Sequence, residues 1–280
     1  MSAAGSAGVT VVLSGGGAKT AAHIGAVRAI EEAAMAPVRY VATSMGAVVA
    51  AALAGGADRT ALPARLGAVG RAGVVREPFA VVRGLFSRGL LRAAPFRQAV
   101  ERLVPARRFA DLSVPITVSV VDLDSGELLL FGEGGEEAPL VDVLCASCAL
   151  PVYYPPVRLA GRRCGDGGLR GPLPLDVAAR LAREPVVAVD VGPGLEAMAA
   201  GPAADAPPVV RAHDDAVGAL MATATAAQLA LWRADRGRPT LVYVRPPVER
   251  HATFQVDRVG EYAEHGYRAT RDALAAVGRP

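Results

Sequence analysis

The stretch Leu13-Ser-Gly-Gly-Gly-Ala-Lys-Thr20 separates an apolar run from an alanine-rich segment and contains the only lysine of the chain, Lys19. Residues 9–13, before it, Val-Thr-Val-Val-Leu, have the pattern of a continuous buried strand, and residues 20–34, after it, have the apolar spacing of a helix. The sequence therefore predicts a strand, a glycine-rich turn and a helix. Consecutive glycines at a helix N-terminus expose backbone N–H groups that can bind an anion or stabilise a developing oxyanion.

Two nucleotide-binding motifs fit this turn poorly. A phosphate loop aligned on Lys19 and Thr20 places Leu13 and Ala18 where that motif needs glycines. A dinucleotide fingerprint would need Thr20 at its last glycine, and no clear acidic residue closes a second strand about twenty residues further on. A nucleotide-binding protein is therefore a distant alternative. A tight turn without any binding role is a further alternative for this segment.

A second strand and helix are predicted at residues 38–42 and 47–54, on either side of Ala42-Thr-Ser-Met-Gly46. This turn has the form of a nucleophile elbow, in which a serine sits on a strained bend and its neighbours two positions away must be small. Gly46 meets that requirement, whereas Ala42 stands where the motif usually has glycine. Together with the glycine-rich turn on the preceding strand, this pattern makes Ser44 a candidate nucleophile.

A serine nucleophile also needs a base. None of the four histidines lies in a compelling loop after a predicted strand: His23, His213, His251 and His265. A sharper candidate is Asp166 in Arg163-Cys-Gly-Asp-Gly-Gly168, because glycines on both sides let the backbone bring the carboxylate close to another loop. A turn aspartate without a chemical role is the alternative for this motif alone.

The remaining pattern predicts an α/β fold in which strands alternate with helices. Further strands are expected at residues 116–121, 127–131, 186–191 and 241–244, and further helices at residues 94–104, 175–183, 214–233 and 258–277. This order favours a three-layer α/β/α domain with a mainly parallel central sheet. We expect residues 1–280 to form one domain, with a core at about 9–191, a helical cap region at about 57–110 and a C-terminal strand and helix at 240–278.

Composition excludes several classes of protein. Of the 280 residues 52% are hydrophobic and 20% are charged, which indicates a globular chain. The net charge of +3 comes from nearly balanced totals, and no basic tract with interleaved aromatic residues accompanies it, so we expect no nucleic-acid partner. Cys145, Cys148 and Cys164 favour buried small apolar side chains over a metal or redox site.

Targeting signals are not apparent in the sequence. The N-terminus has no basic segment typical of a signal peptide, so we expect a cytoplasmic protein. The longest apolar stretch, residues 47–57, is shorter than the ~20 residues that a membrane span needs. Any membrane contact is therefore expected to be peripheral.

Taken together, the motifs resemble those of the patatin-like phospholipases. Residues 14–19 resemble the oxyanion loop of that family, residues 43–46 its elbow and residues 166–168 its Asp-Gly-Gly/Ala motif. Three further segments stand in the same order as in the family: Asp111-Leu-Ser-Val-Pro115, Asp122-Leu-Asp-Ser-Gly-Glu127 and Ala146-Ser-Cys-Ala-Leu-Pro151. Several ordered motifs are far more specific than any one of them.

The resemblance implies a lipid acyl hydrolase that works through a Ser-Asp dyad and needs no metal or cofactor. Ser44 would attack the acyl carbonyl and Asp166 would accept its proton. Lys19 would add positive potential for an anionic group, with a solvated surface position as the alternative. The oxyanion would be stabilised by backbone N–H groups drawn from Gly15, Gly16, Gly17, Ala18 and Met45.

Three departures from the family pattern bear on the pocket, at Thr20, Ala42 and Pro172. Two alternative functions use the same residues. An acyltransferase would pass the acyl group from serine to an acceptor other than water, and a catalytically silent relative would only bind lipid. Residues 74–103, which mix apolar side chains with arginines, suggest either a basic amphipathic cap that docks anionic lipid or a helical excursion packed on the sheet.

Overall fold

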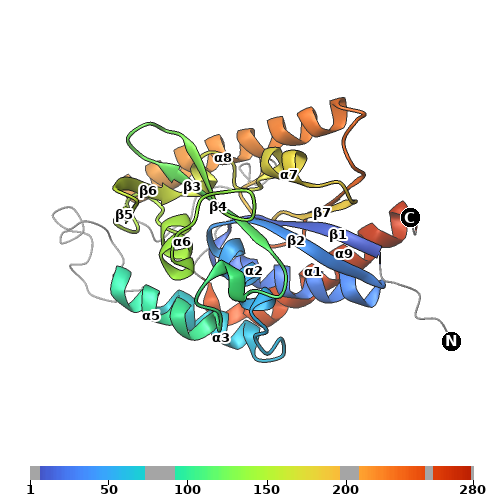
Figure 1. Ribbon diagram of the computed structural model, residues 1–280, viewed down its shortest axis with the longest axis horizontal. Helices are drawn as coiled ribbons and strands as arrows, with labels where there is room; N and C mark the ends of the chain where they lie inside the picture. Colours follow the sequence, from blue (N-terminus) through green and yellow to red (C-terminus); the bar gives the residue numbers. More distant parts are fainter. Residues whose placement is uncertain (1–6, 73–91, 196–207, 250–254, 279–280) are drawn as a thin grey trace.

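The computed structural model describes residues 7–72, 92–195, 208–249 and 255–278. They form one eight-stranded sheet and the helices around it (Figure 1). Five strands run parallel in the order β3-β2-β1-β7-β8. Their bounds are Ile116–Asp122 for β3, Met35–Thr43 for β2, Ala7–Leu13 for β1, Val186–Val189 for β7 and Leu241–Val244 for β8. The prediction of a mainly parallel central sheet is confirmed.

The other three strands complete one end of the sheet in antiparallel pairing. β4 (Leu128–Gly132) pairs with β3, β6 (Arg162–Asp166) also pairs with β3, and β5 (Val157–Leu159) pairs with β6. β3 and β4 form a hairpin, with Gly126 at a φ of 76° in its turn. β5 and β6 were not predicted as strands.

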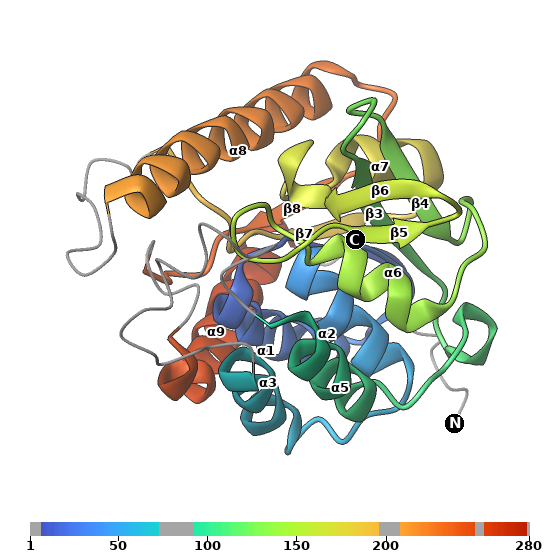
Figure 2. The ribbon, with the colours of Figure 1, turned by 90° about the vertical axis from the view of Figure 1, so that its left-hand side faces the viewer.

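Helices cover both faces of the sheet, which makes the three layers (Figures 1 and 2). One side carries α1 (Ala21–Glu32), α2 (Ser44–Ala54), α3 (Leu62–Ala72), α5 (Ala93–Leu103), α6 (Leu140–Ser147) and α9 (Val259–Val277). The other side carries α7 (Leu175–Leu181) and the long helix α8 (Pro208–Ala234). Short 3-10 turns lie at Gly17–Thr20, Phe109–Asp111, Gly167–Leu169 and Val256–Arg258.

Two apolar cores lie on the two faces of the sheet. Val11 and Leu13 of β1 belong to the core beneath α1, α2, α6 and α9, whereas Val12 belongs to the core beneath α7 and α8. Successive strand residues point to opposite faces, so a strand buried on both faces is apolar at nearly every position. This explains why residues 9–13 are apolar except at Thr10.

The predicted elements occur with shifted ends. β2 begins three residues earlier than expected, and α8 begins at Pro208 instead of residue 214. α3 lies in the segment 57–110, where a helical cap region was predicted without helix bounds, whereas α6 was not predicted. Residues 74–91 of the proposed basic cap at 74–103 lie outside the described residues. That residues 1–280 form a single domain remains a prediction.

Candidate active site

Ser44 occupies the bend between β2 and α2 with a φ of 53°. A non-glycine residue in this left-handed region is uncommon, and such strain persists where the surrounding structure imposes it. The strained bend predicted for the elbow is therefore present, although Ala42 takes the place of the usual glycine. Ala42 is fully buried within β2, where it pairs with Leu13 and Val118.

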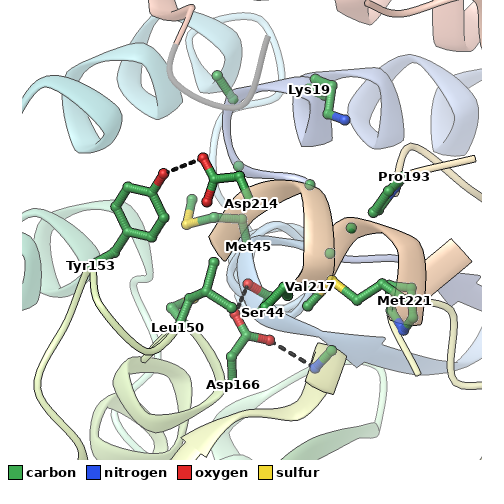
Figure 3. A pocket seen from close by; sticks show the side chains of 18 of the residues that line it. Lys19, Ser44, Met45, Leu150, Tyr153, Asp166, Pro193, Asp214, Val217 and Met221 are labelled. Atoms are coloured by element: carbon green, nitrogen blue, oxygen red, sulfur yellow. Dashed lines mark hydrogen bonds between the residues drawn. The ribbon is translucent and has the colours of Figure 1, made fainter. Parts of the chain in front are cut away.

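The hydroxyl of Ser44 donates a hydrogen bond of 2.7 Å to Oδ2 of Asp166 (Figure 3). Asp166 ends β6, and the pairing of β6 with β3 brings it beside the elbow at the end of β2. Its other oxygen accepts the N–H of Gly168 at 2.7 Å. A Cβ on Gly167 would lie 2.3 Å from the carbonyl oxygen of Ser119, so this approach of the Asp-Gly-Gly turn to β3 requires glycine.

The environment of Asp166 suits a base. The residue is 4% exposed, and this burial raises the pKa of its carboxyl from 3.8 to about 6. The hydrogen bonds from Ser44 and Gly168 act in the opposite direction, because they stabilise the charged form. A carboxyl with this pKa is mostly ionised at neutral pH and is still basic enough to accept a proton.

No histidine of the described chain hydrogen-bonds to Ser44. His23 is fully buried, its Nε2 lies 2.8 Å from the carbonyl oxygen of Ser14, and burial lowers its pKa to about 4. It therefore supports the glycine turn. His213 contacts Asp214, and His265 lies near Glu261, while His251 is outside the described residues.

The glycine turn lies next to the elbow and contributes to the same pocket. The N–H groups of Gly16 and Gly17 make no hydrogen bond within the described residues. Met45 is in the first turn of α2, where N–H groups have no intrahelical acceptor. The N–H of Gly15 donates to the carbonyl oxygen of Pro172 at 2.9 Å. Because that N–H is already engaged, Gly15 is a poorer candidate donor for an oxyanion than was predicted.

Other positions singled out in the sequence also reach this region. Lys19 is 3% exposed and lines the pocket, so the alternative of a solvated surface lysine is wrong. The hydroxyl of Thr20 donates to the carbonyl oxygen of Gly17 at 2.6 Å, inside the turn. Cys148 is buried on the pocket wall, and burial raises the pKa of its thiol well above the ordinary value. This thiol is therefore uncharged.

The pocket has a volume of about 320 Å³, and Ser44 and Asp166 both line it. Its wall is mostly apolar, formed by side chains that include Leu66, Phe96, Leu150, Val217 and Met221. Figure 3 shows Val217 and Met221 of α8 facing the elbow. Such a cavity can bind an apolar ligand beside the serine.

Several residues of the site were missed in the sequence. The hydroxyl of Tyr153 donates to Oδ2 of Asp214 at 2.6 Å, which connects the loop after α6 to α8 at the pocket (Figure 3). These residues are 61 positions apart, and no local pattern indicates their contact. Ser147 accepts the N–H of Ser44; it lies in the family-like segment 146–151, which was noted without a role for any residue in it.

The comparisons with known proteins agree with this architecture. A family model described as patatin-like phospholipase matches residues 11–179. The fold is similar to that of VipD from Legionella pneumophila, with a TM-score of 0.50 and 16% sequence identity over 98% of this chain and 68% of that one. At this identity the similarity concerns the fold alone.

Two curated relatives match at higher identity. An uncharacterized NTE family protein of Mycobacterium tuberculosis is 33% identical over 208 residues, 73% of this chain and 54% of the relative. Human patatin-like phospholipase domain-containing protein 6 is 30% identical over 189 residues, 66% of this chain and 13% of that protein. The chain thus spans about half the length of the first of these relatives and much less of the second. By its family match over residues 11–179, the chain belongs to the patatin-like phospholipase family.

Proposed function

We propose that this protein is a serine acyl hydrolase that cleaves acyl ester bonds of phospholipid-type lipids through Ser44 and Asp166. The observation that carries the proposal is the 2.7 Å hydrogen bond from the Ser44 hydroxyl to the Asp166 carboxylate inside a mostly apolar pocket. Membership of the patatin-like phospholipase family supports a lipid ester as the substrate. The strained φ of Ser44 supports its role as the nucleophile, because strain of this kind concentrates at functional sites.

In the proposed first step, the Ser44 oxygen forms a bond to the acyl carbonyl carbon while Asp166 takes the hydroxyl proton. The carbonyl oxygen becomes an oxyanion. As the tetrahedral species collapses, the bond to the alcohol breaks and the alcohol oxygen receives the proton from Asp166. The acyl-serine remains. We assign stabilisation of the oxyanion to N–H groups of the glycine turn and the elbow, namely those of Gly16, Gly17, Ala18 and Met45.

In the second step, water attacks the acyl-serine and Asp166 accepts a proton from the water. Collapse breaks the bond between the carbonyl carbon and the Ser44 oxygen, which takes that proton back. A fatty acid leaves and the free dyad is restored. The raised pKa of Asp166 favours this exchange, because the same carboxyl must accept and return a proton in each step.

The pocket wall supports the choice of a lipid substrate. Apolar side chains such as Phe96, Leu150 and Met221 can cover an acyl chain, while Lys19 can pair with an anionic group of the substrate. Among the described residues, no helix is both long enough and apolar enough to cross a membrane. We propose peripheral contact with lipid surfaces and a cytoplasmic location.

The test is labelling with a fluorophosphonate probe together with release of fatty acid from phospholipid in mixed micelles. The wild type should be labelled and should release fatty acid in buffer alone. Ser44→Ala and Asp166→Asn should each lower turnover by about 10³-fold or more. Ser125→Ala, which removes an exposed hydroxyl from the β3–β4 turn, is the matched control and should leave turnover unchanged.

Three outcomes would redirect the assignment. Turnover retained by Asp166→Asn would mean that another group deprotonates the serine. Acyl transfer that requires an added alcohol, amine or thiol would favour an acyltransferase. A wild type that is neither labelled nor active would favour a lipid-binding protein.

A further inference from the structure

Ser147 lies directly behind the elbow. It is the last residue of α6 and is fully buried. Its Oγ accepts the backbone N–H of Ser44 at 2.7 Å and donates to the backbone carbonyl oxygen of Ser119 at 2.8 Å. The hydroxyl therefore links the elbow to β3 through two hydrogen bonds, one in each role.

The next turn of the same segment contacts the other member of the dyad. The N–H of Asp166 donates to the carbonyl oxygen of Ala149 at 3.1 Å. Ser147 and Ala149 are two residues apart, so a single short segment supplies the acceptors for the N–H groups of both Ser44 and Asp166. Ser44 and Asp166 are separated by 122 positions in the sequence, and this segment is their shared support.

β3 pairs with both β2, which leads to Ser44, and β6, which ends at Asp166. Its residue Ser119 pairs with Thr43, next to Ser44, and its residue Val120 pairs with Asp166. The carbonyl oxygen that Ser147 contacts thus belongs to the strand that separates β2 from β6. Movement of the Ser147 hydroxyl would change the position of the elbow relative to the strand that carries Asp166.

The N–H of Ser44 needs an acceptor of this kind. It belongs to the first residue of α2, so it has no partner within the helix, and it is buried. A buried N–H without an acceptor is costly, and the left-handed φ of 53° adds strain at the same residue. Without the acceptor, relaxation of this residue would relieve both costs and move the Ser44 side chain.

We propose that Ser147 is a positioning residue, whose hydroxyl fixes the backbone of Ser44 so that the nucleophilic oxygen stays within hydrogen-bonding distance of Asp166. This inference rests on the proposed function in taking Ser44 and Asp166 as the working dyad. Ser147 does not touch the substrate in this role. It acts through the backbone of the nucleophile.

Two variants test the inference, both removing the acceptor. Ser147→Ala deletes the hydroxyl, whereas Ser147→Cys keeps a side chain of similar size that is only a weak acceptor. With p-nitrophenyl butyrate as substrate, each variant should lower kcat by about 10–100-fold and leave KM within about twofold, because misplaced reacting groups affect chemistry more than binding. The rate of fluorophosphonate labelling should fall by a similar factor.

The pH profile supplies a readout that general destabilisation would not move. The hydrogen bond from Ser44 lowers the pKa of Asp166. If that bond is weakened in Ser147→Ala, the acid limb of kcat/KM should shift to higher pH. The matched control is Ser113→Ala, which removes a similar hydrogen bond, from a serine hydroxyl to the carbonyl oxygen of Ala54 at 2.7 Å, away from the dyad. Its profile should match the wild type.

Wild-type kcat and an unshifted acid limb in Ser147→Ala would overturn the inference, as would an equal loss of kcat in Ser113→Ala. If Ser147→Ala does not fold, Ser147→Cys decides the question by the same kinetic criteria. Crystal structures of the wild type and a folded variant separate this inference from the proposed function. Separation of the Ser44 oxygen from Asp166 in the variant supports positioning even if the wild type proves inactive, and an unchanged contact rejects it.

Discussion

Gly46 and Ser14 are in backbone contact: a Cβ built on Gly46 would stand 2.3 Å from the carbonyl oxygen of Ser14 and 2.8 Å from that of Leu13. Gly46 is the last residue of the elbow, and Ser14 begins the glycine turn, so the two loops that form the site touch without an intervening side chain. The same carbonyl oxygen of Ser14 lies 2.8 Å from Nε2 of His23. The geometry of the site therefore depends on a small residue at position 46.

Gly46→Ala should destabilise the fold by about 2–3 kcal/mol, because a methyl group in this space must displace backbone. Urea unfolding monitored by circular dichroism measures the change. Gly260→Ala is the matched control, since a Cβ there would meet nothing within 4 Å and the residue lies in α9. It should change stability by less than about 1 kcal/mol. Equal unfolding midpoints for the two variants would contradict the argument.

Much of the fold could be predicted because its central strands are buried on both faces. Residues 9–13, 116–121 and 186–191 are mostly apolar, with polar residues only at Thr10, Thr117, Ser119 and Asp190, and the ends of their strands lie within two residues of the predicted ends. β6 was not predicted because it contains Arg162 and Arg163. It lies on an outer part of the sheet, where a strand does not need to be apolar throughout. α6 was missed because eight mostly apolar residues do not distinguish a helix from a strand.

The site could be predicted only where its geometry requires a particular residue type at a nearby position in the sequence. The bend at Ser44 requires a small residue at position 46, and the close turn after Asp166 requires Gly167, so both positions are visible as motifs. The contact of Tyr153 with Asp214 produces no sequence motif, because any two polar side chains that the fold brings together can make such a contact. The engaged N–H of Gly15 was equally invisible, since Pro172 supplies its acceptor from a distant loop.

Hydrolysis of p-nitrophenyl butyrate should depend on the ionisation of Asp166. Its pKa is about 6, and the proposed base works only when ionised. We expect kcat/KM to fall about tenfold per pH unit below that value and to level off above it. His23, with a pKa of about 4, should not contribute to this limb. A profile that stays flat from pH 7 down to pH 5, with circular dichroism showing a folded protein throughout, would count against Asp166 as the base.

Asp166→Asn should reveal the energetic cost of the buried carboxylate. The folded carboxyl has a pKa of about 6 and its ordinary value is 3.8, so the folded state binds the proton more tightly. Wild-type stability therefore falls as pH rises from about 4 to about 6 through this group. Asn cannot ionise, so we expect the variant to gain up to about 3 kcal/mol over the wild type at pH 7.5.

That advantage should disappear at pH 4, where Asp166 is protonated in the folded wild type. Urea unfolding of both proteins at pH 4 and pH 7.5 gives the two differences. Because other groups titrate equally in both proteins, only the change in the difference matters. The same difference at both pH values would show that the substitution acts through shape and not through charge.

Lys19 should govern the preference for anionic substrate groups. Its side chain is 3% exposed and lines the pocket that contains Ser44, and a charge-assisted hydrogen bond to a phosphate oxygen is worth about 1.5–3 kcal/mol. We therefore expect Lys19→Met to lower kcat/KM for phosphatidylglycerol at least tenfold relative to p-nitrophenyl butyrate. Lys19→Arg, which keeps the positive charge, should lose less. Each variant is compared on both substrates, so a general loss of stability or of nucleophile activity lowers both rates and leaves their ratio unchanged. A ratio equal to that of the wild type in Lys19→Met would remove this lysine from substrate recognition.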